Sequence, residues 1–146
     1  MGYWKIRGLA SQIRYQLAYL RVEYEMIEYE MGGPPDFSRD AWLQDKFNLG
    51  LDFPNLPYFI HGDFAFTDTV AIHKYIAGRW GPELLGRDVD ERAQVNMVAS
   101  IVADLKGGTT QGCYLDGDKE QLEGVVFAKV PPMIAYLGNK KFLVGD

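Results

Sequence analysis

The stretch from Asn48 to Ile60 holds residues whose types and spacing suit a binding site. Pro54 and Pro57 each fix a backbone φ angle and remove an N–H donor, so the intervening Asn55 and Leu56 lie in a stiff loop. A Leu56–Pro57 peptide bond in the cis form would turn the Leu56 backbone toward an extended peptide beside it. The loop therefore predicts main-chain recognition of a peptide, and a rigid turn into a strand is the alternative interpretation.

A second candidate site is the pair Asp68–Thr69, which we expect to begin a helix. The unpaired N–H groups and the dipole at a helix N-terminus attract an anion such as a carboxylate, and Thr69 fits that role. Asp68 is itself an anion, so it would repel a bound carboxylate and pair with a neighbouring ammonium. Ordinary capping of the helix is an equally good interpretation of Asp68.

Cysteine and histidine contribute little chemistry in this sequence. Cys113 is the single cysteine, which excludes an intramolecular disulfide. No base is expected beside it, so we predict a small buried residue and not a nucleophile. His61 and His73 lack the spacing of metal ligands, and we predict no metal site.

Hydrophobic spacing predicts a small mixed α/β unit over residues 1–80. Two amphipathic helices are expected, one over about residues 10–21 and one that begins near Asp68. Their buried faces should carry Ile13, Leu17 and Leu20 in the first helix and Ile72, Ile76 and Trp80 in the second. The other expected elements are a strand ending at Trp4, a strand over 24–31, a short helix capped by Asp40, and a hairpin of strands 58–60 and 64–66.

The rest of the chain, residues 87–146, has a helical pattern and follows a linker over residues 81–86. Apolar residues of two helices fall on one face each: Val95, Val98, Ile101, Val102 and Leu105, then Leu122, Val126, Met133 and Leu137. Pro131 and Pro132 should kink the second helix or mark an irregular point in it.

Composition restricts the possible partners of the chain. The 146 residues are 47% hydrophobic, enough for a packed core. The formal net charge of -5 argues against a phosphate-binding surface, so nucleic acid is not an expected partner. No apolar run reaches the roughly twenty residues that span a bilayer, and no membrane partner is expected. With its single cysteine the chain fits a reducing, cytoplasmic setting.

Two segments resemble the cytosolic glutathione transferases, most closely the mu class. They are GLDFPNLPY at Gly50–Tyr58 and GYWKIRGL at Gly2–Leu9. The similarity continues through Phe37–Phe47 and the helix near Asp68, and more weakly to Phe142–Asp146.

The resemblance implies a fold in two parts. An α/β thioredoxin-like, glutathione-binding domain at 1–80 is followed, after a linker at 81–86, by a partial all-α domain at 87–146. The family has further strand residues before its Gly-Tyr pair and further helices beyond the matched segment. The resemblance therefore implies a chain that is truncated at both ends.

The resemblance also implies a chemistry, the conjugation of the glutathione thiolate to electrophilic small molecules. Tyr3 matches the catalytic tyrosine, whose hydroxyl donates a hydrogen bond to the sulfur. A hydrogen bond to the charged form lowers the pKa of a thiol, so one donor raises the thiolate fraction near neutral pH.

Other positions are assigned by the same resemblance. The glutathione-binding set implied is Trp4, Trp42, Lys46, Asn55, Leu56, Pro57, Asp68, Thr69 and Asp104. Within it, Trp42 and Lys46 match donors to the glycyl carboxylate, and Asp104 matches an acidic residue that reaches across a dimer. The mu-class pattern has Gln-Ser at Asp68–Thr69, so Asp68 departs from it. Leu9 and Tyr114 match the electrophile site.

The partners that the resemblance implies are glutathione, as co-substrate and without a further cofactor, and a hydrophobic electrophile. Phe53 matches an aromatic residue that inserts into a partner subunit, which implies a homodimer in the cytoplasm with a detoxification role. The alternative is a non-catalytic relative that serves as a binding or structural subunit of a larger assembly. Tyr3 and Leu56–Pro57 favour the enzyme, whereas Asp68 and the shortened ends favour the alternative.

Overall fold

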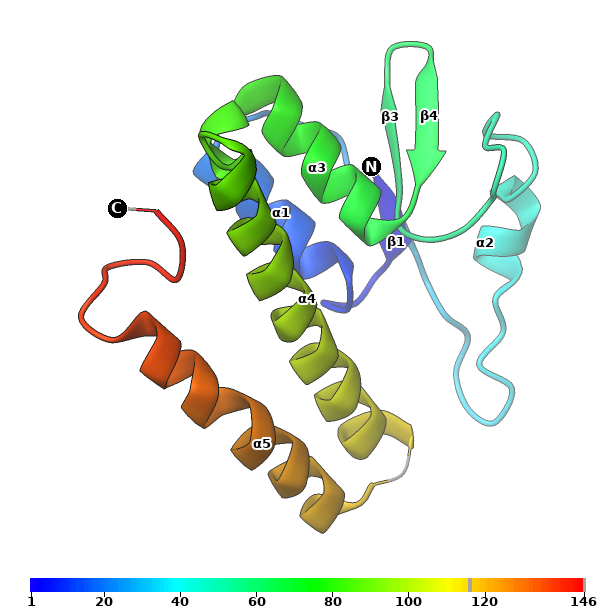
Figure 1. Ribbon diagram of the computed structural model, residues 1–146. Helices are drawn as coiled ribbons and strands as arrows, with labels where there is room; N and C mark the ends of the chain where they lie inside the picture. Colours follow the sequence, from blue (N-terminus) through cyan, green and yellow to red (C-terminus); the bar gives the residue numbers. More distant parts are fainter. Residues whose placement is uncertain (116, 146) are drawn as a thin grey trace. The chain divides into compact units, whose positions relative to one another are not determined.

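The computed structural model describes residues 1–115 and 117–145, and at positions 114 and 115 the description is confined to the backbone. Contacts between residues divide the chain into two compact units, Met1–Leu84 (unit 1) and Leu85–Asp146 (unit 2). Unit 1 holds all the strands of the described chain, and unit 2 is helical (Figure 1). Each unit is described here by itself.

Unit 1 is built on a four-stranded sheet of order β2-β1-β3-β4. The strands are β1 (Gly2–Trp4), β2 (Ile27–Tyr29), β3 (Tyr58–His61) and β4 (Phe64–Thr67). β1 pairs in parallel with β2 and antiparallel with β3, and the β3–β4 hairpin completes the sheet. The helices are α1 (Ala10–Tyr19), α2 (Asp40–Asp45) and α3 (Thr69–Trp80).

The predicted apolar faces of the first helix and of the helix that follows Asp68 are confirmed, and they supply much of the core of unit 1. Ile13 and Leu17 of α1 and Ile72 and Ile76 of α3 are fully buried. Each such side chain contributes about 1.5–3 kcal/mol through its removal from water. The last members of the stripes, Leu20 and Trp80, pack at the edge of the core.

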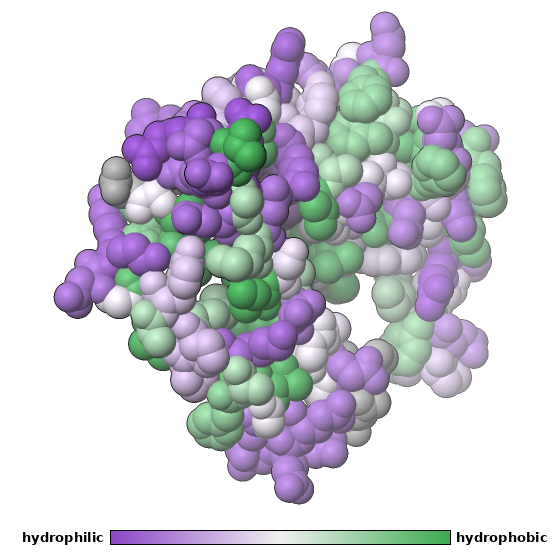
Figure 2. Space-filling view, in the orientation of Figure 1, coloured by the Kyte–Doolittle hydropathy of each residue, from purple (hydrophilic) through white to green (hydrophobic). Residues whose placement is uncertain are grey.

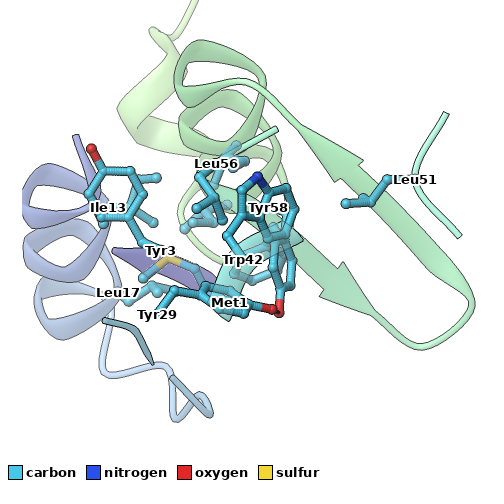
Figure 3. Packing of buried hydrophobic residues seen from close by; sticks show 13 residues of the cluster. Met1, Tyr3, Ile13, Leu17, Tyr29, Trp42, Leu51, Leu56 and Tyr58 are labelled. Atoms are coloured by element: carbon cyan, nitrogen blue, oxygen red, sulfur yellow. Dashed lines mark hydrogen bonds between the residues drawn. The ribbon is translucent and has the colours of Figure 1, made fainter. Parts of the chain in front are cut away.

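An aromatic cluster forms the part of the core that contains α2 (Figure 3). The ring of Trp42 stacks on Tyr58 with centroids 6.1 Å apart and meets Tyr29 edge-on at 5.3 Å. The strand beneath requires a glycine, because a Cβ at Gly2 would lie 2.1 Å from the Tyr58 ring. The cluster therefore ties α2 to the sheet through rings from β2 and β3.

Three sequence predictions for unit 1 need correction. The strand expected over 24–31 is paired only at Ile27–Tyr29, opposite the three residues of β1. The first helix ends at Tyr19, and Arg21 has a positive φ of 55°. Asp40 does not cap α2: it is the first helical residue, and its own N–H donates to the Ser38 hydroxyl.

Unit 2 consists of α4 (Val89–Thr110), the π-helical turn η2 (Gln111–Leu115) and α5 (Lys119–Leu137). The predicted linker contains a short 3-10 helix, Pro82–Leu85. Asp88 caps α4 and Asp118 caps α5, each by accepting backbone N–H groups of the first turn. Pro131 and Pro132 lie inside α5, which continues past them.

The apolar stripes of α4 and α5 face each other only in part. Their members are half-buried, and no described residue of either helix is fully buried. The predicted burial of Cys113 is wrong: this residue lies in η2 and is exposed, whereas its neighbour Gly112 is the buried side of the turn. Among the described helices, none is long and apolar enough to cross a membrane.

Candidate functional site

Tyr3 is held with its hydroxyl group at the end of β1. The side chain is only 6% exposed, and its oxygen accepts the backbone N–H of Leu9 at 3.1 Å. A phenol has one proton and two lone pairs, so this contact occupies a lone pair and leaves the proton to donate. Tyr3 thus has a proton free to donate toward a ligand, and its catalytic role stays a prediction.

The turn before α1 fits closely over this hydroxyl. Gly8 has φ +37°, and a Cβ built there would lie 2.6 Å from the Tyr3 oxygen and 2.8 Å from its ring. A residue other than glycine would be strained and would push on the tyrosine. Sequence reasoning did not single out Gly8, although its place five residues after Tyr3 was the available signal.

The proline loop contains a cis Leu56–Pro57 bond, the form that would turn the Leu56 backbone toward a peptide ligand. The Leu56 side chain is buried, and its backbone N–H donates to the Asn55 side-chain oxygen at 2.9 Å. A peptide ligand would therefore displace the Asn55 carbonyl from this N–H or bond the Leu56 carbonyl instead. The Thr67 hydroxyl, which the sequence analysis missed, donates to the Phe53 carbonyl at 2.9 Å and joins the loop to β4.

At the start of α3, Asp68 acts as the helix cap. Its side-chain oxygen accepts the Ala71 N–H at 2.9 Å, so the capping interpretation of this residue is confirmed. The φ of Asp68 is +83°, in a region that costs about 1–3 kcal/mol for a residue with a side chain. Thr69 is the first helical residue and is half-buried. One carboxylate oxygen of Asp68 therefore serves the helix, and its role toward an ammonium stays a prediction.

Trp42 and Lys46 lie one turn apart on α2 and its C-terminal end. Trp42 is only 5% exposed, yet its indole N–H has no hydrogen-bond partner among the described residues and is not enclosed. It can therefore donate to an incoming acceptor. Lys46 is half-buried, with its ammonium 5.2 Å from the centre of the Phe47 ring.

A hydrogen-bonded chain of side chains, which the sequence analysis also missed, anchors α2. The Tyr29 hydroxyl donates to an Asp45 carboxylate oxygen and lies 3.1 Å from the Tyr58 hydroxyl. Burial, and then the bond with Tyr58, raises the pKa of Tyr29 far above its ordinary value. The phenol therefore stays protonated and remains a donor to Asp45. No sequence spacing predicts this chain, because strand pairing brings its members together.

Beside Trp4 there is a shallow open depression of about 260 Å³ at the end of β1 and β2. Its lining residues are Trp4, Lys5, Ile6, Tyr29, Glu30 and Met31. Lys5 and Glu30 form an ion pair across the two strand ends. Trp4 thus borders a depression that a ligand can enter. Its partner on β2 is Tyr29, whose ring packs against Trp42.

The remaining predicted residues are less closely associated with this site. Leu9 is exposed at the start of α1, and Phe53 is 83% exposed on its loop. Asp104 belongs to unit 2, where its carboxylate pairs with the Lys129 ammonium at 3.1 Å between α4 and α5. The side chain of Tyr114 lies outside the described residues. Unit 1 alone therefore supplies Tyr3, Trp4, the proline loop, α2 and the start of α3.

Comparison with known proteins gives consistent matches. Residues 1–78 match the family model described as the glutathione S-transferase N-terminal domain. A glutathione S-transferase of Tyrophagus putrescentiae is 40% identical over 149 residues, which cover 99% of this chain and 66% of the relative. Glutathione S-transferase Mu 1 of Macaca fascicularis is 39% identical over 150 residues, which cover 100% of this chain and 67% of the relative.

A solved structure agrees with these matches. The crystal structure of the glutathione S-transferase Blo t 8 superposes with a TM-score of 0.73 and 33% identity, over 94% of this chain and 60% of that protein. The thioredoxin-like fold expected for the N-terminal part is therefore confirmed. The chain spans about two thirds of the length of the curated relatives it matches.

Proposed function

This chain belongs to the glutathione S-transferase family, and we propose that it conjugates the thiolate of glutathione to small hydrophobic electrophiles. The observation that supports this most is the environment of Tyr3. Its oxygen accepts the Leu9 N–H, so its proton is available to the glutathione sulfur. The hydrogen bond from the Tyr3 hydroxyl to the sulfur stabilises the thiolate relative to the thiol, and the thiolate then attacks the electrophile.

In this proposal the rest of glutathione, a tripeptide, binds along the residues of unit 1 described above. The cysteinyl backbone pairs with Leu56 before cis Pro57, once the Asn55 side chain leaves the Leu56 N–H. The γ-glutamyl carboxylate takes the hydroxyl and N–H of Thr69 at the start of α3. The carboxylate oxygen of Asp68 that does not cap the helix faces the γ-glutamyl ammonium.

The glycyl carboxylate binds at the other end of the site. The indole N–H of Trp42 and the ammonium of Lys46 are its donors, with Trp4 beside them. Glutathione is the co-substrate, and this chemistry requires no further cofactor.

Four further residues, from both units, complete the proposal. Leu9 and Tyr114 contact the electrophile, and Asp104 exchanges Lys129 for the glutathione ammonium of a partner subunit. The exposed ring of Phe53 fills an apolar pocket on the second subunit of a homodimer. A dimer that sediments unchanged after Phe53→Ser would remove that contact. We place the protein in the cytoplasm, which cell fractionation tests.

The test of the activity is the rate of conjugation with a chlorodinitrobenzene at neutral pH. We expect Tyr3→Phe to lower the rate by about 10- to 100-fold, the worth of a hydrogen bond to a charged group. Tyr19→Phe is the matched control, since it makes the same change at an exposed tyrosine. A parent protein that does not accelerate the reaction would contradict the proposal and support a non-catalytic relative.

A further inference from the structure

We propose that Tyr29 is a positioning residue for glutathione: its hydroxyl group holds the C-terminal end of α2, which keeps Trp42 and Lys46 aimed at the glycyl carboxylate. The inference rests on the proposed function, because it concerns the part of the site that binds this carboxylate. Tyr29 lies on β2, is only 4% exposed, and donates to the Asp45 carboxylate at 3.1 Å. In this role it acts on the ligand through α2.

α2 is too short to keep its shape unaided. It has six residues, Asp40–Asp45, and isolated helices shorter than about 12–15 residues are marginal in water. Trp42 lies within the helix, and Lys46 is the residue that ends it. The positions of both carboxylate donors therefore depend on contacts between α2 and the rest of unit 1.

Contacts of two kinds join α2 to the sheet. The Trp42 ring stacks on Tyr58 and meets Tyr29 edge-on within the aromatic cluster (Figure 3). The hydrogen bond from Tyr29 holds the last turn, because Asp45 is the last helical residue. Asp45 lies about one turn after Trp42 and directly before Lys46. The Tyr29 hydroxyl is thus connected to the end of α2 from which the ammonium projects.

The two partners of this hydroxyl set the direction of its proton. A carboxylate can only accept, so the Tyr29 proton is donated to Asp45. The Tyr58 hydroxyl, 3.1 Å away, then donates to the Tyr29 oxygen, and complete burial fixes Tyr58 in place. Burial, and then the bond with Tyr58, raises the pKa of Tyr29, so the group stays a donor at neutral pH.

The hydrogen bond also engages the carboxylate that precedes Lys46 in the chain. An Asp45 carboxylate without a donor would attract the neighbouring ammonium and compete with the glycyl carboxylate for it. The Lys46 ammonium lies 5.2 Å from the centre of the Phe47 ring. Loss of the Tyr29 hydroxyl should therefore weaken glycyl carboxylate binding both by releasing the end of α2 and by freeing a competitor.

The test compares glutathione with its glycyl ethyl ester, in which an uncharged ester replaces the carboxylate at that end. Tyr29→Phe keeps the ring against Trp42 and removes the donor. Tyr58→Phe is the matched control, because it also removes one buried hydroxyl but leaves the bond between Tyr29 and Asp45 in place. Calorimetric titration measures the affinities, and a thermal melt reports the folding of each variant.

We expect Tyr29→Phe to weaken glutathione binding by about 3- to 10-fold and ester binding by less than about twofold. Tyr58→Phe should change either affinity by less than about twofold. A general loosening of unit 1 would weaken both ligands alike, since the ester keeps the γ-glutamyl and cysteinyl groups. Equal losses for the two ligands, or an unchanged glutathione affinity in Tyr29→Phe, would overturn the inference.

Variants of Asp45 repeat the test without disturbing a buried ring, since this residue is exposed. Asp45→Asn and Asp45→Ala both remove the negative charge, but only asparagine keeps an oxygen that accepts from Tyr29. Asp45→Asn should bind glutathione about 3- to 10-fold more tightly than Asp45→Ala. Tyr29→Phe should add no further loss to Asp45→Ala, because the two residues act through one bond. Equal glutathione affinities in the two Asp45 variants would contradict the proposed role.

The parent protein separates this inference from the proposed function. A parent that conjugates glutathione but binds the ester as tightly as glutathione would overturn this inference and leave the activity standing. A parent that neither binds glutathione nor accelerates the conjugation would overturn both.

Discussion

Unit 1 and unit 2 differ in how they bury their apolar residues. Unit 1 has a continuous core in which Ile13, Leu17, Ile72 and Ile76 are completely covered. In unit 2 the apolar stripes of α4 and α5 are half-buried, and Phe127 of α5 is 71% exposed. Hydrophobic residues are visible at the surface among hydrophilic ones in Figure 2.

The difference shows which residues can hold a precise geometry. A side chain keeps its position when packed neighbours and hydrogen bonds fix it, and loosely packed residues sample several positions. Tyr3 and Trp42 meet this condition in unit 1. Asp104 in unit 2 is fixed by a single exposed ion pair, which contributes about 0–1 kcal/mol.

The largest expected contrast is between two isoleucines. Ile76→Ala should lower the free energy of unfolding of unit 1 by about 2–5 kcal/mol, because it opens a cavity in a closed core. Ile101→Ala on α4 should cost less than about half as much, since its site is half-buried. Trp4, Trp42 and Trp80 all lie in unit 1, so urea titration followed by tryptophan fluorescence reports that unit, and the same titration followed by circular dichroism adds the helices of unit 2. Equal losses for the two variants would contradict the contrast.

Two glycines sharpen the contrast between the units, because substitution by alanine should lower stability at one glycine and raise it at the other. Gly2→Ala should destabilise unit 1 by about 1–3 kcal/mol, since its Cβ would overlap the Tyr58 ring. Gly124→Ala, inside α5, meets nothing within 4 Å and should stabilise the helix by up to about 1 kcal/mol. Thermal melts followed by circular dichroism measure both. A stable Gly2→Ala protein would show that the strand can move away from the ring.

The smallest expected effect is a loss of stability at high pH. Burial, as the largest cause, raises the pKa of both Tyr29 and Tyr58 in the folded protein. The stabilisation is complete below the ordinary tyrosine pKa of about 10 and falls as pH rises, because the unfolded chain then loses protons first. The free energy of unfolding should fall by at most about 1.4 kcal/mol per pH unit for each tyrosine.

Tyr29→Phe removes one titrating group and should flatten this alkaline loss, whereas Tyr136→Phe on the exposed surface of α5 should leave it in place. Urea midpoints between about pH 8 and 11 give the comparison. Identical pH profiles for the parent and Tyr29→Phe would show that this tyrosine is not protected.

Local sequence patterns predicted much of unit 1. The apolar faces of the two helices and the hairpin were expected from periodicity and turn residues, and both are present. The cis form of Leu56–Pro57 was weighed only for its effect on the Leu56 backbone, and the structure contains it. The chain Tyr58–Tyr29–Asp45 was not predicted, because its members are far apart in sequence and meet only after β1 pairs with β2 and β3.

The close fit of Gly8 to Tyr3 was missed for a related reason: a positive φ in a turn leaves no periodic pattern. The errors at Asp40 and Cys113 came from local preference alone. Ser38 takes the N–H at the start of α2, and in the unit 2 turn Gly112 is buried while the side chain of Cys113 is exposed. The roles of Asp104, Tyr114 and Phe53 stay predictions.

The central claim is that Tyr3 stabilises the thiolate of glutathione in a site built by unit 1, and the pKa of the bound thiol tests it most directly. Ultraviolet titration should show this pKa about one to two units below that of free glutathione in the parent protein. In Tyr3→Phe, with glutathione still bound, the value should return close to that of the free thiol. A bound thiol pKa that equals the free value in the parent, or that stays lowered in Tyr3→Phe, would contradict the account.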